Sequence, residues 1–121
     1  MEQNILEKRK EKIAGIILKG TNNSAGGQTG SMENLRAVST MAKKYGIPRI
    51  IDGARYAENA YFVKMREKGY QDKSILEISQ ELFSLADIFL MSAKKDGLVN
   101  IGGIIAINND EDLFRKCQTY I

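Results

Sequence analysis

The stretch "DIFLMSAKKDGLVNIGGIIAI", residues 87–107, contains two apolar runs, residues 87–91 and 102–107, each with the length of a buried strand. Only residues 92–101 separate the two runs. A connection between parallel strands takes a dozen or more residues, usually with a helix, whereas antiparallel strands can be joined by a short loop. We therefore predict that residues 102–107 form an antiparallel neighbour of the preceding strand, or an edge strand.

The segments upstream alternate between short apolar runs and amphipathic stretches. Apolar runs at 13–18 and 50–51 predict two further strands, and residues 19–30 predict a polar, glycine-rich loop. Helices are expected from Ser31 to Gly46, at about 56–67 with Ala57, Ala60, Tyr61 and Lys64 on related turns, from Ser74 with Glu77 completing a capping box, and from Asn109 or Asp110. This alternation predicts an α/β domain with a mainly parallel sheet and an antiparallel last strand.

Composition limits the classes of function. The 121 residues carry a net charge of +3, and the basic residues are scattered without interleaved aromatics, so we expect no nucleic-acid binding. No apolar segment approaches the length of a membrane span. One cysteine, Cys117, and no histidine exclude a cysteine–histidine or serine–histidine pair and a usual zinc site within this chain. A reducing, cytoplasmic setting is the expectation.

Polar side chains follow the predicted strands at the points where the strands end. Because the carboxyl ends of parallel strands lie at one edge of a sheet, ligands of α/β proteins bind there. The residues that this rule brings together are Thr21, Asn22 and Asn23 after the first strand, Asp52 and Arg55 after the second, and Ser92, Lys94 and Lys95 after the third. An amide, a carboxylate, a guanidinium and two amines are therefore expected at one edge.

This set of side chains suits pyridoxal phosphate. A lysine amine reacts with an aldehyde cofactor, and a carboxylate keeps the proton on the pyridine nitrogen, which the ring needs in order to withdraw electrons. A serine hydroxyl and a second ammonium suit a phosphate. Each residue also has an ordinary interpretation, Asp52 as a turn former and the lysine pair as surface residues. The joint spacing favours a cofactor site and leaves open which lysine reacts.

Three motifs carry a resemblance that extends this interpretation over nearly the whole chain from Ile13. They are "NNSAGGQTGSMENLRAVS" (22–39), "IDGARYAENAYFVKMREKGYQDKSI" (51–75) and "MSAKKDGLVNIGG" (91–103). Together they resemble the tryptophanase and tyrosine phenol-lyase family of pyridoxal-phosphate β-eliminating lyases. The resemblance implies an aspartate-aminotransferase-like (fold type I) three-layer domain, with residues 1–121 as a fragment of its large cofactor-binding domain.

The resemblance also implies roles for the residues at the sheet edge. Lys95 would carry the cofactor and act as the base, and Asp52 would pair with the pyridine nitrogen. Arg55 and Asn23 would lie at the 3-oxygen of the ring.

Two further groups are assigned in the same way. Ser92 and Lys94 would lie at the phosphate of the cofactor. Asn100 matches a position that helps to bind an activating potassium ion in the phenol-lyase branch.

The implied reaction is the cleavage of an aromatic amino acid, tryptophan to indole, pyruvate and ammonia. The segments "NNSAGG" and "SAKKD" resemble tryptophanase, whereas "VNIGG" resembles the phenol-lyase, so tyrosine is the alternative substrate. The sequence departs from the family pattern at Thr29 and Gly30, which replace a Pro-Val pair, and at Gly53, which replaces a small side chain. Neither change removes a group with an implied catalytic role.

The resemblance covers only a middle part of the family's large domain. Members of the family place a ring-stacking aromatic, an acidic potassium ligand and an arginine for the substrate carboxylate in other parts of the chain. We therefore expect the 121 residues to be inactive alone and to act in a homo-oligomer, a tetramer in this family, or with complementing segments of a split lyase. The alternative is a truncated, non-catalytic remnant.

Overall fold

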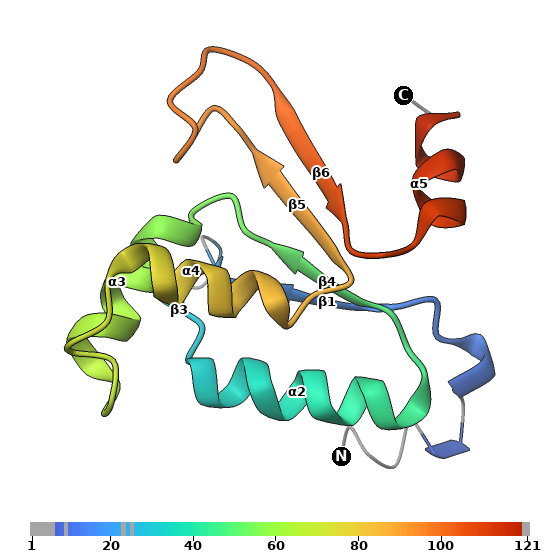
Figure 1. Ribbon diagram of the computed structural model, residues 1–121, viewed down its shortest axis with the longest axis horizontal. Coiled ribbons are helices and arrows are strands. Elements are labelled where there is room, and N and C mark those ends of the chain that lie inside the picture. Colours follow the sequence, from blue (N-terminus) through green and yellow to red (C-terminus); the bar gives the residue numbers. More distant parts are fainter. Residues whose placement is uncertain (1–6, 9, 23, 25, 120–121) are drawn as a thin grey trace.

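The computed structural model describes residues 7–8, 10–22, 24 and 26–119. The elements along the chain are η1 (Lys10–Lys12), β1 (Ile16–Lys19), β2 (Thr21–Asn22), β3 (Gln28–Thr29), α2 (Met32–Tyr45), β4 (Arg49–Asp52), α3 (Tyr56–Arg66), α4 (Ile75–Ser84), β5 (Ile88–Ser92), β6 (Gly103–Ile107) and α5 (Glu111–Gln118). Figure 1 shows α2, α3 and α4 beside a sheet from which the β5–β6 hairpin extends.

The main sheet has the strand order β1-β4-β5-β6. Strand β4 pairs in parallel with both β1 and β5, and β6 pairs antiparallel with β5. The prediction of a mainly parallel sheet with an antiparallel last strand is therefore confirmed. The short connection between β5 and β6 explains the change of direction, because no helical crossover fits there.

Local capping signals place the helix ends where the sequence predicts them. The Ser31 hydroxyl accepts a hydrogen bond from Asn34 N–H at the start of α2, and Gly46 ends this helix with a left-handed φ of 66°. Ser74 and Glu77 form the expected capping box of α4. Asp110 caps α5 by accepting from Leu113 N–H at 2.8 Å.

The core lies on one face of the sheet. It combines side chains of α2, α3, α4 and β4, with Met32, Leu35, Ile51, Ala60, Val63, Ile78 and Leu82 all buried. The other face carries a row of isoleucines in register across all four strands, namely Ile17, Ile50, Ile88 and Ile107. Ile17 is 61% exposed, so the described residues leave this apolar face open at the β1 edge.

Three details differ from the prediction. Strand β1 begins at Ile16 rather than Ile13, because its ladder begins with the Ile16 N–H bond to the Pro48 carbonyl and Pro48 has no N–H to extend the pairing. The loop at 19–30 contains the β2–β3 hairpin, which Gly26 and Gly27 allow through φ values of 72° and 78°. In α3 the buried residues are Asn59, Ala60 and Val63, whereas Tyr61 is 51% exposed.

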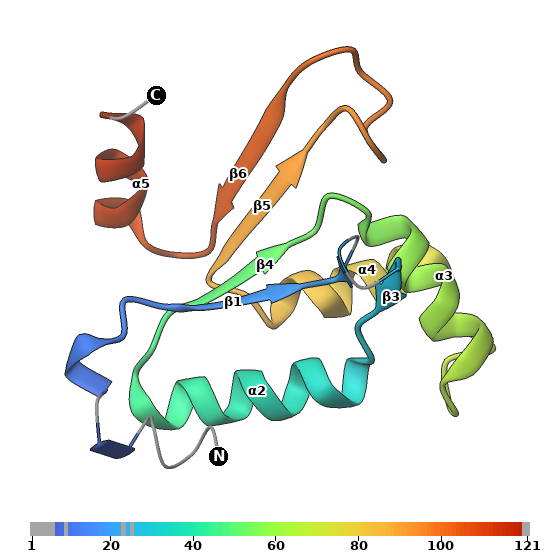
Figure 2. The same ribbon diagram turned by 180° about the vertical axis from the view of Figure 1, so that it is seen from behind.

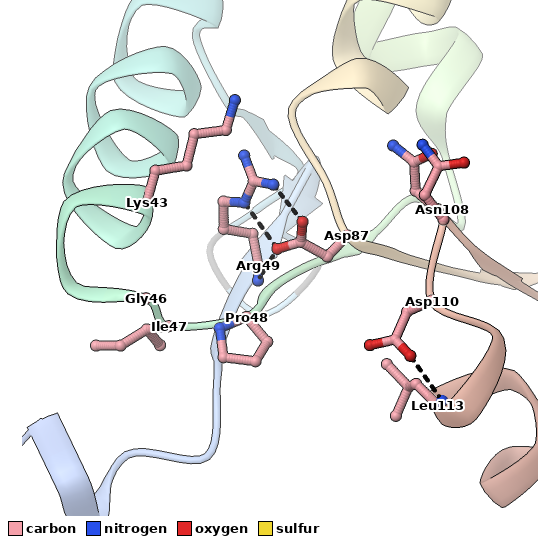
Figure 3. A pocket seen from close by; sticks show the side chains of 10 residues that line it. Lys43, Gly46, Ile47, Pro48, Arg49, Asp87, Asn108, Asp110 and Leu113 are labelled. Atoms are coloured by element: carbon pink, nitrogen blue, oxygen red, sulfur yellow. Dashed lines mark hydrogen bonds and ion pairs between the residues drawn. The ribbon is translucent and has the colours of Figure 1, made fainter.

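An ion pair closes the end of the sheet where β4 and β5 begin. The Arg49 side chain is buried, and its Nε and its backbone N–H both donate to Asp87 Oδ2 at 2.8 Å (Figure 3). Arg49 also donates to the Ser39 hydroxyl at 2.9 Å, and Ser39 donates to the Leu85 carbonyl at 3.1 Å. The hydrogen bonds from Arg49 lower the pKa of Asp87 below its ordinary value. This network joins α2 to β4 and to the residue before β5.

We predict that Asp87→Ala destabilises the chain by about 2–3 kcal/mol, because the buried Arg49 guanidinium loses its charged partner. The Asp87 side chain is 36% exposed, so water can partly replace the lost carboxylate. Urea unfolding of the 121-residue chain measures this change. The matched control is Glu111→Ala, which breaks the exposed Arg115–Glu111 pair, with side chains 67% and 80% exposed. That variant should lose less than about 1 kcal/mol, and equal losses in both variants would contradict the prediction.

A further variant, Asp87→Asn, tests how the Asp87 carboxylate makes stability depend on pH. Since the folded pKa of Asp87 is depressed, its ionised form contributes stability that is present above its ordinary pKa of 3.8 and is lost as the pH falls through the lower folded value. Asp87→Asn should therefore show a shallower loss of unfolding free energy between about pH 5 and pH 2 than the unaltered chain, as measured by urea unfolding at each pH.

Candidate active site

The turn between β4 and α3, residues 52–55, is the centre of the candidate site. Asp52 ends β4 and lies in register with Lys19 of β1 and Leu90 of β5. Ser92 follows Leu90 by two residues, and side chains alternate along a strand, so Asp52 and Ser92 lie on the same face of the sheet. Lys19 shares this face beside Asp52, a neighbour that the sequence interpretation missed.

The glycine-rich loop after β1 is joined to this turn. Gly20 N–H donates to the Asp52 carbonyl at 3.0 Å, and the Thr21 hydroxyl donates to the Arg55 carbonyl at 3.4 Å. At the far end of the loop, the fully buried Asn59 of α3 accepts from Gly30 N–H at 2.9 Å and donates to the Gly30 carbonyl at 3.1 Å. Asn59 thus fixes the loop on α3. The predicted site residue Asn23 lies outside the described residues.

Residues 93–102, which we call the lysine loop, follow β5. The loop contains two successive turns, and a hydrogen bond joins its two ends. Lys95 N–H donates to the Ser92 carbonyl at 3.3 Å, and the Lys95 carbonyl accepts from Leu98 N–H at 3.0 Å. Ala93 N–H closes the loop on the Gly102 carbonyl at 3.0 Å. A Cβ at Gly97 would lie 2.5 Å from the Ala93 carbonyl oxygen, so this turn accepts only glycine without moving its backbone. The Lys94 side chain is exposed, whereas Lys95 is half-buried.

Asp96 joins the lysine loop to the start of α3. Its carboxylate Oδ2 accepts from Ala57 N–H at 2.8 Å, and its own N–H donates to the Ala54 carbonyl at 3.5 Å. Arg55, the N-cap residue of α3, makes no side-chain capping bond, so the capping carboxylate comes from Asp96, 39 residues after Ala57. Figure 2 shows α3 and the loop after β5 at the same end of the sheet. Sequence reasoning missed Asp96 because a cap is normally sought next to the helix.

A steric contact sets the backbone after Asp52. Gly53 N–H donates to the Leu90 carbonyl at 2.8 Å, which continues the β4–β5 pairing past the strand end. A Cβ at Gly53 would lie 2.0 Å from Phe89 Cε2, so the glycine makes room for the aromatic ring. Phe89 in turn packs on Phe83 and Tyr56, with ring centroids 4.6 and 6.2 Å away. The departure at Gly53 therefore has a local explanation.

The side chains at this edge fit a pyridoxal-phosphate site by their chemistry. Asp52 Oδ1 accepts from Ala54 N–H at 3.3 Å, and no described residue donates a hydrogen bond to Oδ2, so this oxygen can accept from a protonated ring nitrogen. Arg55 makes a loose contact of 3.7 Å with Glu58 and is partly exposed. A carboxylate, a guanidinium, a hydroxyl and two amines thus occur on adjacent segments, as the sequence predicts.

The predicted metal ligand Asn100 lies at an exposed position of the lysine loop. Within the described part of the chain, no group of three or more Asp, Glu, Cys or His side chains is arranged to hold a metal ion. Potassium binding at Asn100 stays a prediction. Among the described helices, none has the length and apolar character needed to cross a membrane.

A hollow of about 410 Å³ lies at the opposite end of the parallel strands, where β4 and β5 begin (Figure 3). Its lining includes Lys43, Pro48, Asp87, Asp110 and Leu113. The carboxylates there already have protein partners, since Asp87 pairs with Arg49 and Asp110 caps α5. The hollow also lies where the parallel strands begin, whereas α/β proteins bind ligands where they end. We therefore place the candidate site at the edge with Asp52, Ser92 and Lys95.

Solved structures support the fold. The chain superimposes on a "putative L-allo-threonine aldolase" from Listeria monocytogenes EGD-E with a TM-score of 0.68 and 24% identity, covering 97% of this chain and 29% of that one. It also matches a "Putative aromatic amino acid beta-eliminating lyase/threonine aldolase" from Exiguobacterium sp. 255-15 with a TM-score of 0.60 and 24% identity, covering 87% of this chain and 25% of that one. At this identity the likeness establishes the fold alone.

Curated relatives are more similar in sequence. Tyrosine phenol-lyase of Clostridium tetani is 50% identical over 121 residues, which is 100% of this chain and 26% of the relative. Tryptophanase of Escherichia coli O9:H4 is 44% identical over 121 residues, covering 98% of this chain and 26% of the relative. A "Probable beta-eliminating lyase" of Trichomonas vaginalis is 60% identical over 101 residues, covering 84% of this chain and 22% of the relative.

The chain thus spans about a quarter of the length of the curated relatives that it matches. The family model described as "Beta-eliminating lyase" matches residues 1–121. The chain belongs to the β-eliminating lyase family.

Proposed function

We propose that these 121 residues form part of the large domain of a pyridoxal-phosphate lyase that cleaves an aromatic amino acid by β-elimination. The observation that carries the proposal is the meeting of three segments at one sheet edge, with the turn after Asp52 bonded to the loop that begins at Gly20 and to the lysine loop. The family is generally pyridoxal-phosphate dependent, and the donor set at this edge matches that cofactor.

When bound, the cofactor supplies an electron sink for the bond-breaking step. We assign two roles to Lys95. It attaches the cofactor covalently, and after its amine is released from the cofactor it removes the α-proton of the substrate. Asp52 holds the proton at the pyridine nitrogen through its carboxylate. Arg55 and Asn23 would contact the 3-oxygen of the ring.

The phosphate and the metal complete the assignment. Ser92 through its hydroxyl and Lys94 through its ammonium would donate hydrogen bonds to the phosphate. Both residues lie at or just after the end of β5. Asn100 would contribute an amide oxygen to a potassium ion whose other ligands would come from outside these residues.

We propose tryptophan as the substrate, which with one water gives indole, pyruvate and ammonia. The segments "NNSAGG" and "SAKKD" favour this choice. Tyrosine is the second candidate, and the 50% identity to a tyrosine phenol-lyase over the whole chain favours it. The complete lyase is proposed to work as a homo-oligomer, a tetramer, or to assemble from complementing segments.

The first test is cofactor capture in a completed enzyme. The 121 residues replace the matching segment of the Clostridium tetani tyrosine phenol-lyase, and borohydride traps pyridoxal phosphate on the protein. Peptide mapping should place the label on Lys95, since this half-buried residue lies on the hydrogen-bonded turn of the lysine loop. A label on Lys94, or on no lysine of this segment, would refute the assignment.

In the same completed enzyme, Asp52→Asn should keep part of the cofactor binding but lower kcat by at least about a hundredfold. A neutral amide cannot hold the pyridinium proton, so the electron sink is lost. Steady-state elimination and cofactor absorbance are the two measurements. The control Asp72→Asn changes an exposed carboxylate in the loop before α4 and should behave like the unaltered enzyme. Near-normal elimination by Asp52→Asn is the outcome that rules this role out.

The 121-residue chain alone should turn over neither tryptophan nor tyrosine and should self-associate. Holding reactants in place is worth on the order of 7–11 kcal/mol, and the groups that would hold the substrate are expected outside this chain. Ile17, which is 61% exposed at the β1 end of the isoleucine row, also offers an apolar surface to a second copy. Indole or phenol release and light scattering measure the two outcomes, and Ile17→Lys should reduce self-association. A monomer with lyase activity would contradict both.

A further inference from the structure

We propose that Asp96 is the positioning residue that selects Lys95 over Lys94 as the lysine that takes the cofactor aldehyde. The proposal rests on the proposed function, because it presumes that a lysine of this loop reacts with pyridoxal phosphate. Sequence alone leaves two adjacent amines of the same chemistry at the end of β5. Something in the tertiary structure must therefore distinguish them.

The backbone on both sides of Lys95 is pinned. Its own N–H donates to the Ser92 carbonyl at 3.3 Å, and its carbonyl accepts from Leu98 N–H at 3.0 Å. The next N–H, that of Asp96, donates to the Ala54 carbonyl at 3.5 Å. Ala54 lies two residues after Asp52, so this bond ties the lysine loop to the turn that carries the proposed ring partner.

The Asp96 carboxylate makes the shorter link. Its 2.8 Å bond from Ala57 N–H is charge-assisted, and it places a negative group at the positive end of α3. The backbone bond to Ala54 is long, so we assign most of the hold on the loop to the carboxylate. Gly97 adds a steric limit, because its backbone lies against the Ala93 carbonyl and leaves the double turn little room to rearrange.

The two lysine residues of the loop differ in burial. Lys95 is half-buried, whereas Lys94 is exposed. If the carboxylate link is removed, the loop loses its tie to α3 and the two lysines become more alike in their access to the sheet edge. The predicted consequence is a change in which amine reacts, and it is separate from any change in the stability of α3.

The experiment uses the 121-residue chain and pyridoxal phosphate as the probe. The lysine nitrogen bonds to the aldehyde carbon, the aldehyde oxygen leaves as water, and borohydride then delivers hydride to that carbon and fixes the label. Fragmentation mass spectrometry gives the ratio of label on Lys95 to label on Lys94. The unaltered chain should favour Lys95, and Asp96→Ala should lower the ratio about tenfold, the effect of losing one hydrogen bond to a charged group.

Three variants control the result. Asp96→Asn keeps an oxygen acceptor for Ala57 N–H and should retain most of the selectivity. Asp110→Ala removes an equivalent capping bond of 2.8 Å from α5 and should leave the ratio unchanged. If circular dichroism shows that Asp96→Ala does not fold, Asp96→Glu replaces it, because one added methylene displaces the carboxylate and should also lower the ratio.

The outcomes separate the two proposals. An unaltered chain that labels Lys95 but keeps the same ratio in folded Asp96→Ala or Asp96→Glu overturns the role of Asp96 and leaves the proposed function standing. An unaltered chain that labels Lys94 as readily as Lys95 overturns the assignment of Lys95 itself. A loss of selectivity in Asp110→Ala equal to that in Asp96→Ala would reduce Asp96 to a structural cap.

Discussion

The register of β4 between its two neighbours is the constraint on which the rest of the structure depends. Asp52 lies opposite Lys19 on one side and Leu90 on the other. Hydrogen bonds from Gly20 to Asp52 and from Gly53 to Leu90 carry the pairing past the strand end on both sides. Because side chains alternate along a strand, a slip of one residue in β4 would turn Asp52 and Ile50 to the helix-covered face and take Ile51 out of the core.

The polar side chains at the two ends of the sheet differ in how fully other protein groups satisfy their hydrogen bonds. Where the parallel strands begin, Arg49, Asp87 and Ser39 satisfy one another in a buried network. Where they end, the Asp52 carboxylate accepts a single, long hydrogen bond from the described residues, and Lys94 is exposed. Polar groups with protein partners stabilise a fold, whereas groups without them remain able to meet a ligand. This contrast supports the placement of the site at the carboxyl ends.

Two glycines, which have no side chain, allow the close contacts that shape the candidate site. Gly53 leaves space for the Phe89 ring, and Gly97 lets the lysine loop turn against the Ala93 carbonyl. Gly53 lets the turn after β4 approach β5, and Gly97 lets the lysine loop fold back on itself. The backbone positions of both segments therefore depend on these contacts as well as on local conformational preference. Among the described residues, the isoleucine face of the sheet is open at Ile17, which is 61% exposed.

The sequence by itself determined the features that depend on neighbouring residues. Helix caps at Ser31, Ser74 and Asp110 were predictable because a cap bonds to the turn beside it. The antiparallel β6 followed from a loop length, and the gathering of Asp52, Ser92 and Lys95 at one edge followed from the rule for parallel strands.

Only the tertiary structure decided the contacts between segments far apart in the chain. The cap of α3 by Asp96, the clasp of Gly30 by Asn59 and the burial of Arg49 on Asp87 each join residues at least 29 positions apart. A pattern of neighbouring residues carries no signal for such pairs, because their energy depends on distances that exist only after the sheet has assembled. The β2–β3 hairpin was missed for a similar reason, since two-residue strands are too short to show a period.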